Sequence, residues 1–81
     1  MRLNFSARAL RDYRGLPKNL NKIADKQFTL LLCNFKHPSL HTKKYDENYD
    51  IWQARISRDY RFYFRIKGDL YEIVTIIKHP K

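Results

Sequence analysis

Two arginines, Arg55 and Arg61, lie on either side of a short turn in the stretch WQARISRDYRFYF, residues 52–64. Polar and apolar residues alternate in both flanking segments, and a period of two is typical of β-strands with one buried face. The alternation places both arginines opposite the aromatic side chains. If residues 57–59 form the turn, Arg55 lies directly across from Arg61, where like charges destabilise a sheet by roughly several tenths of a kcal/mol.

A bound phosphate group would relieve this repulsion, because a guanidinium binds phosphate oxygens through two parallel hydrogen bonds. The pair therefore predicts an anion-binding site on the outer face of a sheet. Two exposed arginines with nothing bound are the other interpretation, and the pattern leaves both open. A neighbouring acid would also relieve the repulsion, and we expect Glu72 to lie near Tyr63 on this face.

Three consecutive strands are expected to carry these arginines. Their predicted ranges are Ile51–Ser57, Tyr60–Ile66 and Leu70–Ile77, with Lys67-Gly68 as a tight hairpin turn. In the middle strand one face should hold Tyr60, Phe62, Phe64 and Ile66, and the opposite face Arg61, Tyr63 and Arg65. The aromatic face should pack against helices, which predicts that Trp52 and Phe64 belong to the core.

The first half of the chain predicts two helices after a short edge strand at Arg2–Phe5. Ser6 is a typical N-cap for a helix ending near Gly15, and Pro17 begins a second helix that runs to about Phe35. Its apolar stripe at spacings of three and four comprises Leu20, Ile23, Ala24, Phe28, Leu31, Leu32 and Phe35. The short connection makes an antiparallel αα-hairpin. We expect a loop over residues 36–48 and a core position for Cys33.

Length and charge limit the kind of protein. Eighty-one residues make one small domain, residues 1–81, and 17 Lys and Arg against 8 acids give a net charge of +9. Such a charge attracts polyanions, namely RNA, DNA, an anionic membrane or an acidic protein segment. One cysteine excludes an internal disulfide and fits a reducing cytoplasm. We expect no signal peptide and no membrane-spanning segment.

The order of elements and several motifs resemble one family. The stretch HPSLHTKKYDENYDIWQARISRDYRFYFRI, followed by YEIVTIIKH, is similar to the RelE/ParE toxin superfamily of type II toxin–antitoxin systems. The most specific part is the ARIxxDYRFxF core, with an arginine, a short turn and a Tyr-Arg pair. HPSL followed by lysines, and a histidine after the last strand, add to the resemblance, which covers nearly the whole chain.

The resemblance implies an α+β domain with a twisted antiparallel sheet and a tight complex with a cognate antitoxin, as an oligomer. RelE-like members cut mRNA in the ribosomal A site without metal, whereas ParE-like members poison DNA gyrase, and the shared fold does not choose between them. We expect a cytoplasmic, ribosome-dependent mRNA endonuclease. The alternatives are a gyrase-inhibiting toxin and a degenerate member that only binds its antitoxin.

The resemblance also assigns residues. The catalytic candidates are Arg55, Arg61, His79 and Lys43, and the RNA-binding candidates are Lys44, Tyr63, Arg65 and Lys78. In such a site the two arginines would hold the phosphate, and a histidine is a suitable acid or base because it titrates near neutral pH. Either Lys43 or Lys44 takes the remaining role only if neighbouring cations lower its pKa.

The end of the chain differs from the family pattern, and the roles of several tyrosines and histidines are undecided. Many RelE-like nucleases carry a basic and aromatic tail after the histidine, but here Pro80-Lys81 follows His79. We expect the role of a terminal tyrosine to be absent or to be filled by Tyr45, Tyr49 or Tyr63. His37 is expected to fix a loop, and His41 is either exposed surface or part of the site.

Other chemistries fit the sequence poorly. No Cys/His cluster has the spacing of a zinc site, no Gly-rich phosphate loop is present, and no nucleophilic Ser or Cys has an evident partner. We therefore expect no metal, no cofactor and no membrane partner.

Overall fold

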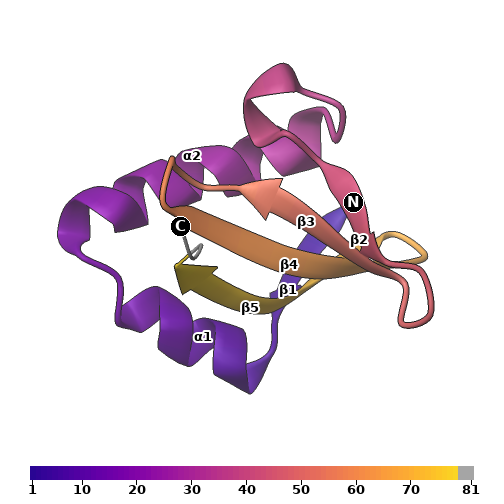
Figure 1. Cartoon of the computed structure of the whole chain (residues 1–81), viewed down its shortest axis with the longest axis horizontal. Coiled ribbons are helices and arrows are strands. Elements are labelled where there is room, and N and C mark those ends of the chain that lie inside the picture. Colours follow the sequence, from indigo (N-terminus) through magenta and orange to yellow (C-terminus); the bar gives the residue numbers. More distant parts are fainter. Residues whose placement is uncertain (79–81) are drawn as a thin grey trace.

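In the computed structural model, which describes residues 1–78, five strands form one sheet with two helices packed against it (Figure 1). The elements are β1 (Arg2–Phe5), α1 (Ala7–Arg14), α2 (Lys18–Cys33), the 3₁₀ turn η1 (Pro38–Leu40), β2 (Lys43–Asp46), β3 (Ile51–Arg55), β4 (Tyr60–Lys67) and β5 (Leu70–Lys78). The strand order is β1-β5-β4-β3-β2, with β1 parallel to β5 and the other pairs antiparallel. The predicted α+β fold with an αα-hairpin and a three-stranded meander is confirmed.

The prediction of a loop over residues 36–48 is wrong at its C-terminal end, where β2 pairs with β3. Lys43 lies opposite Gln53 and Lys44 opposite Trp52, and an irregularity between Lys44 and Asp46 interrupts the register. The segment KKYD has no alternation of apolar and polar residues. An edge strand of this kind is stabilised by its backbone hydrogen bonds to a neighbour, which leave no signal in the side-chain pattern.

The aromatic face of the meander forms the core, as predicted. Phe62 and Phe64 are fully buried, and the ring of Phe28 from α2 meets that of Phe62 with centroids 4.9 Å apart. Trp52 is partly buried and packs edge to face against Phe35 at 5.1 Å. Burying one large aromatic side chain contributes about 1.5–3 kcal/mol, so these rings account for much of the attraction between α2 and the sheet.

The second helix ends at Cys33, earlier than predicted, and Cys33 is exposed rather than buried. The physical reason is helical geometry. Leu31 is fully buried against the sheet, and a residue two positions later points about 200° around the helix axis, away from it. Phe35 lies beyond the helix but still packs against the core.

Helix α1 continues the edge of the sheet where β1 stops. β1 pairs with β5 only as far as Ile73. Beyond that point Ser6, the N-cap of α1, donates its hydroxyl to the Val74 carbonyl at 2.7 Å, while Asp12 Oδ2 accepts from Thr75 Oγ1 at 2.6 Å and from the Ile76 amide at 3.0 Å. Side chains of a helix thus replace strand hydrogen bonds along the second half of β5.

Candidate functional site

The face of the sheet away from the core, here called the open face, carries the candidate arginines. Arg55 on β3 pairs with Arg61 on β4, as the sequence predicts. Lys43 reaches the same face because its partner Gln53 alternates with Arg55 along β3. Three of the four catalytic candidates therefore lie together.

These side chains line a cavity of about 400 Å³, here called the arginine pocket. Its lining residues are His41, Thr42, Lys43, Gln53, Arg55 and Arg61. None of these described residues is acidic. A concave surface lined by three permanent cations on three adjacent strands attracts an anion and excludes a cation.

The β3–β4 turn fixes the position of Arg61. Its Nη1 atom donates to the carbonyl oxygens of Ser57 at 2.7 Å, Arg58 at 3.1 Å and Tyr60 at 3.1 Å. One guanidinium nitrogen is thus used to hold the turn. Because a guanidinium has five N–H donors, the remaining ones stay free for a ligand.

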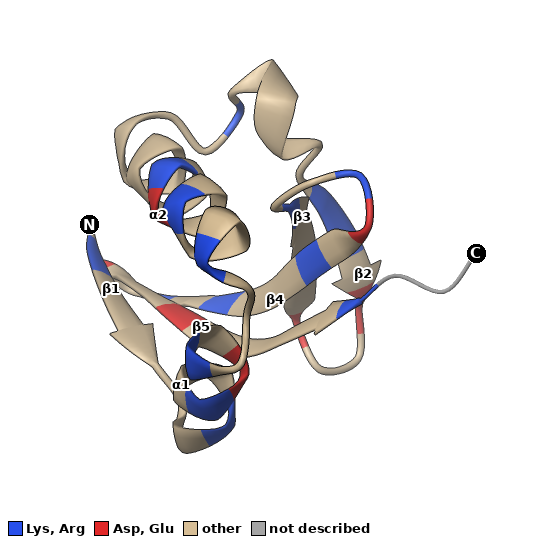
Figure 2. Ribbon diagram, turned by 90° about the vertical axis from the view of Figure 1, so that its left-hand side faces the viewer, with Lys and Arg blue, Asp and Glu red and all other residues tan. Residues whose placement is uncertain are grey.

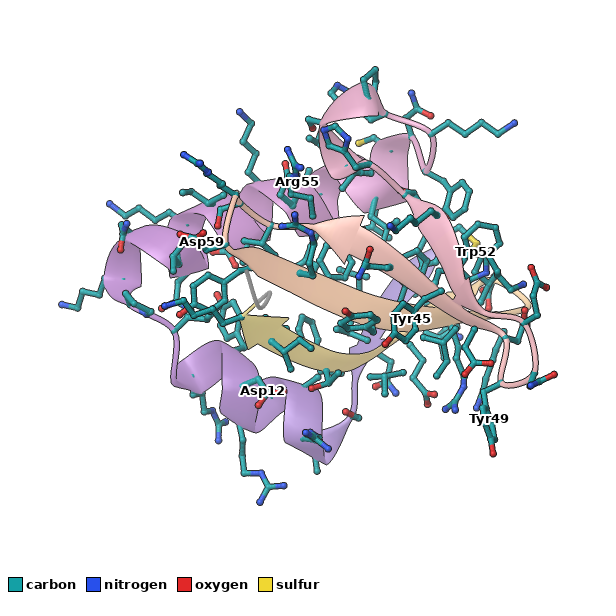
Figure 3. The ribbon with its side chains drawn as sticks, in the orientation of Figure 1. Asp12, Tyr45, Tyr49, Trp52, Arg55 and Asp59 are labelled. Atoms are coloured by element: carbon teal, nitrogen blue, oxygen red, sulfur yellow. The ribbon has the colours of Figure 1, made fainter. Side chains whose placement is uncertain are left out.

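Arg55 differs from Arg61 because its Nε atom is buried and has no hydrogen-bond partner within residues 1–78. Figure 3 shows Arg55 near the end of β3, beside the turn that carries Asp59, yet the structure contains no ion pair between these two residues. A buried unpaired donor costs about 1–3 kcal/mol, more when it is charged. An anion in the pocket would offset part of this cost through its attraction to the guanidinium charge.

Lys44 does not join Lys43 in the pocket. Adjacent residues of a strand point to opposite faces, and the Lys44 ammonium lies 4.7 Å from the centre of the Trp52 ring and pairs with Asp50. The hydrogen bond to the Asp50 carboxylate raises the pKa of Lys44. Lys44 therefore stays protonated at neutral pH, which does not fit the role of a general base.

Arg65 lies on the open face at the opposite end of β4. Its Nε donates to the Tyr49 carbonyl at 3.3 Å, and its Nη1 lies 3.7 Å from the Glu72 carboxylate. Glu72, which the sequence places near Tyr63, lies directly opposite Arg65, the next residue of β4 on this face, while Tyr63 pairs with Thr75. Glu72 therefore neutralises Arg65 and leaves the arginine pocket without an acid.

Tyr63 is buried, with 7% of its surface exposed, and its hydroxyl accepts a hydrogen bond from Gln53 Nε2 at 2.8 Å. Tyr45 covers it with ring centroids 4.8 Å apart, and is itself 60% exposed. In Figure 3, Tyr45 lies nearer than Arg55 to the end of the sheet at which β2 and β3 are connected. Tyr45 is therefore better placed than Tyr63 to stack on a base.

Two further candidates lie at the end of β5. Lys78 is exposed and pairs with Tyr60, so it shares the sheet face of Tyr60 rather than that of Arg61. His79 lies outside the described residues.

Gln53, Thr42 and His41 line the arginine pocket without being among the predicted site residues. For Gln53 a signal existed, since it alternates with Arg55 on one strand. The sequence left His41 open between exposed surface and site, and it gave no signal for Thr42, because the position of both depends on β2 and on the loop that precedes it.

Positive charge is not confined to the pocket. Figure 2 shows Lys and Arg on both helices as well as on the sheet. The pocket is therefore distinguished by its shape and by the Arg55 Nε, which lacks a partner among the described residues, rather than by charge alone. Among residues 1–78 no group of His, Cys, Asp and Glu side chains has an arrangement that could hold a metal ion. None of the described helices is long and apolar enough to cross a membrane.

A family model described as the ParE toxin of type II toxin–antitoxin system, parDE, matches residues 3–81. The chain belongs to the ParE toxin family. It is thus a toxin of a type II toxin–antitoxin system. Its fold is that of the wider RelE/ParE superfamily.

Solved structures of this superfamily superimpose over almost the full chain. A YoeB/ParE toxin from Agrobacterium tumefaciens has a TM-score of 0.82 at 15% identity, covering 99% of this chain and 100% of its own. A YoeB dimer from Staphylococcus aureus has a TM-score of 0.81 at 18% identity, with coverage of 99% and 98%. An intact E. coli RelBE toxin–antitoxin complex has a TM-score of 0.74 at 17% identity, with coverage of 98% and 96%. A comparison with curated proteins gave no match.

Proposed function

We propose that this ParE-family toxin is a metal-independent endoribonuclease that cuts mRNA on the ribosome and thereby inhibits translation. The observation that supports this most is the arginine pocket, which Lys43, Arg55 and Arg61 line, together with the buried Nε of Arg55, which has no hydrogen-bond partner within residues 1–78. A phosphodiester is an anion that matches such a site. The RelE-like branch of the superfamily, which the sequence resembles, cuts mRNA in the ribosomal A site.

Cleavage of RNA by its own 2′-hydroxyl needs charge stabilisation at phosphorus, a base and an acid. Arg55 and Arg61 are held on adjacent strands and would stabilise the charge that develops on the phosphoryl oxygens. Lys43 is a candidate acid for the leaving 5′-oxygen, and His79 is a candidate acid or base.

The remaining candidates would bind RNA around this centre. Lys78 and Arg65 are proposed to contact the RNA backbone beyond the pocket, and Tyr45 takes over the stacking role first expected of Tyr63. Lys44 is tied to Asp50, so its proposed contribution is limited to attracting the phosphate backbone from a distance.

A gyrase-inhibiting function is the second candidate. The family model that matches the chain describes ParE toxins, and ParE-like members of the superfamily act on DNA gyrase without cutting RNA. In that case the arginine pocket would bind a carboxylate or phosphate of the target rather than a scissile bond.

One experiment separates these functions. Wild-type protein and an Arg61→Lys variant are expressed, 5′ ends are mapped on translated mRNA, and gyrase supercoiling is assayed in parallel. We expect new 5′ ends with wild type, far fewer with the variant, and normal supercoiling. Intact mRNA together with blocked supercoiling would replace the nuclease proposal by the gyrase proposal. A chain that affects neither target would be a member that only binds its antitoxin.

We also propose an antitoxin partner in a cytoplasmic complex, because the similar RelBE structure is a toxin–antitoxin complex. The net charge of +9 favours an acidic or amphipathic segment that folds on binding. Co-expression with the product of the adjacent gene should give a complex that co-purifies. A toxin that stays monomeric in that experiment would contradict the proposal.

A further inference from the structure

We propose that His41 is the general base of this site, accepting the proton of the attacking 2′-hydroxyl. This inference rests on the proposed endoribonuclease function. His41 lines the arginine pocket together with Lys43, Arg55 and Arg61. Among the described side chains that line the pocket, it is the only histidine.

The loop that carries His41 is fixed to the strand that carries Arg55. Gln27 of α2 is 5% exposed, and its Nε2 atom donates both to the Ser39 carbonyl at 3.2 Å and to the Arg55 carbonyl at 2.8 Å. Leu40 is fully buried, so the residue directly before His41 is anchored in the core. These contacts hold the backbone before His41 at a defined place relative to the end of β3.

The residues on both sides of the imidazole restrain its backbone as well. The His41 amide donates to the Pro38 carbonyl at 3.2 Å, and Thr42 Oγ1 donates to the Phe35 carbonyl at 3.0 Å. His41 has φ of 48°, in the left-handed region, where Asn, Asp and His occur more often than other residues that have a side chain.

His37, in the same loop, shows what a structural histidine looks like. Its Nδ1 accepts from the Ser39 amide at 3.2 Å and lies 3.0 Å from Ser39 Oγ, which caps η1 as the sequence predicts. The His41 ring, in contrast, has no hydrogen-bond partner within residues 1–78 and is exposed to solvent. His41 is therefore free to exchange a proton with a ligand.

The pocket divides the chemistry between two fixed charges and two groups that exchange protons. The arginines keep their protons at neutral pH and hold the phosphate, Lys43 is the acid, and a histidine side chain is suited to be the base. In the proposed step the 2′-hydroxyl proton passes to the imidazole, the 2′-oxygen bonds to phosphorus and the bond from phosphorus to the 5′-oxygen breaks. The leaving oxygen takes a proton from the Lys43 ammonium, giving a 2′,3′-cyclic phosphate and a 5′-hydroxyl.

The test compares His41→Gln and His41→Asn with His37→Gln in single-turnover cleavage of mRNA on ribosomes as pH is varied. The charged and titratable groups around His41 are Lys43, Arg55 and Arg61 in the arginine pocket, and Lys36 and His37 in an adjoining hollow. Asparagine suits the left-handed backbone, so His41→Asn should remain folded.

Both His41 variants should cleave about 100-fold more slowly and lose the rise in rate with pH on the acidic side, while ribosome binding stays unchanged. His37→Gln should keep that rise. Wild-type rates and an unchanged pH profile in both His41 variants would overturn the assignment of His41 and leave the proposed function standing. A wild-type chain that does not cut mRNA would overturn both.

Discussion

At the scale of single residues, the open face holds two kinds of arginine. Arg65 is neutralised by Glu72 and bonded to the Tyr49 carbonyl. Arg55 faces another arginine, and its Nε has no partner among the described residues. Of these two arginines, Arg65 has contacts that stabilise the fold. Removing the charge of Arg65 should therefore lower the stability of the protein, whereas removing the charge of Arg55 should not.

We predict that Arg55→Gln abolishes activity without destabilising the protein. Relief of the repulsion with Arg61 should leave the free energy of unfolding unchanged or raise it by up to about 0.5 kcal/mol, while cleavage falls by about 100-fold or more. Arg65→Gln is the comparison and should lose less cleavage than Arg55→Gln, because Arg65 is proposed only to contact RNA beyond the pocket. Urea denaturation and 5′-end mapping measure the two quantities, and equal losses of cleavage in both variants would contradict the prediction.

Tyr71 gives a residue-level prediction for alkaline pH. It is 6% exposed and packs against Phe64, and this burial raises the pKa of its phenol above 10.0. A raised pKa in the folded state means that the stabilisation is fully present below the unfolded pKa and is lost as pH rises through the folded value. Wild-type protein should therefore lose stability above about pH 10, and Tyr71→Phe should lose less. Denaturation curves measured across that pH range test the prediction, and Tyr49→Phe, at an exposed position, is the control. Identical curves for wild type and Tyr71→Phe would refute the prediction.

At the scale of elements, α1 completes an edge that β1 leaves open. β1 is four residues long and β5 is nine, so the second half of β5 has no strand on that side. Ser6 and Asp12 supply the missing partners. The short helix is thus held against the sheet by polar side chains as well as by the buried Ala9.

We predict that Asp12→Ala lowers the free energy of unfolding by about 1–3 kcal/mol, because the Ile76 amide and the Thr75 hydroxyl lose their acceptor. Asp25→Ala is the control, since Asp25 accepts only an exposed hydrogen bond from Tyr13. Its cost should be smaller than that of Asp12→Ala. Urea midpoints that are equal for the two variants would show that the helix is not fastened in this way.

At the scale of the whole molecule, the net charge of +9 is spread over both helices and the sheet. Under the proposed function, charge so distributed would attract RNA from a distance, whereas the arginine pocket would determine where the RNA backbone is held. The long-range attraction and the direct phosphate contacts would contribute differently to the salt dependence of RNA affinity, because each direct phosphate contact releases a counterion.

We predict that RNA affinity falls steeply with salt and that Arg55→Gln reduces the slope of log affinity against log salt by about 1. Arg8→Gln removes an equal charge from exposed α1 and should leave the slope unchanged. Titration of a short single-stranded RNA between low and moderate salt measures both slopes. Equal slopes for the two variants would mean that RNA does not enter the pocket.

Local patterns in the sequence predicted the order of the two helices and of all strands except β2, the aromatic core face and the pairing of Arg55 with Arg61. They could do so because strand alternation and helical period depend only on neighbouring residues and a short turn. The ARIxxDYRFxF core and its surroundings were also sufficient to indicate the superfamily.

Tertiary structure alone decided which of the other candidates join the arginines. The pairing of β2 with β3 brings Lys43 into the arginine pocket and turns Lys44 away from it. The two hydrogen bonds of Gln27 join the loop before His41 to the end of β3, so that His41 and Arg55 line one pocket, and Tyr45 covers Tyr63. The physical reason is common to all of them: each depends on backbone pairing or on one polar contact between segments distant in sequence, and such contacts leave no periodic trace in the side chains.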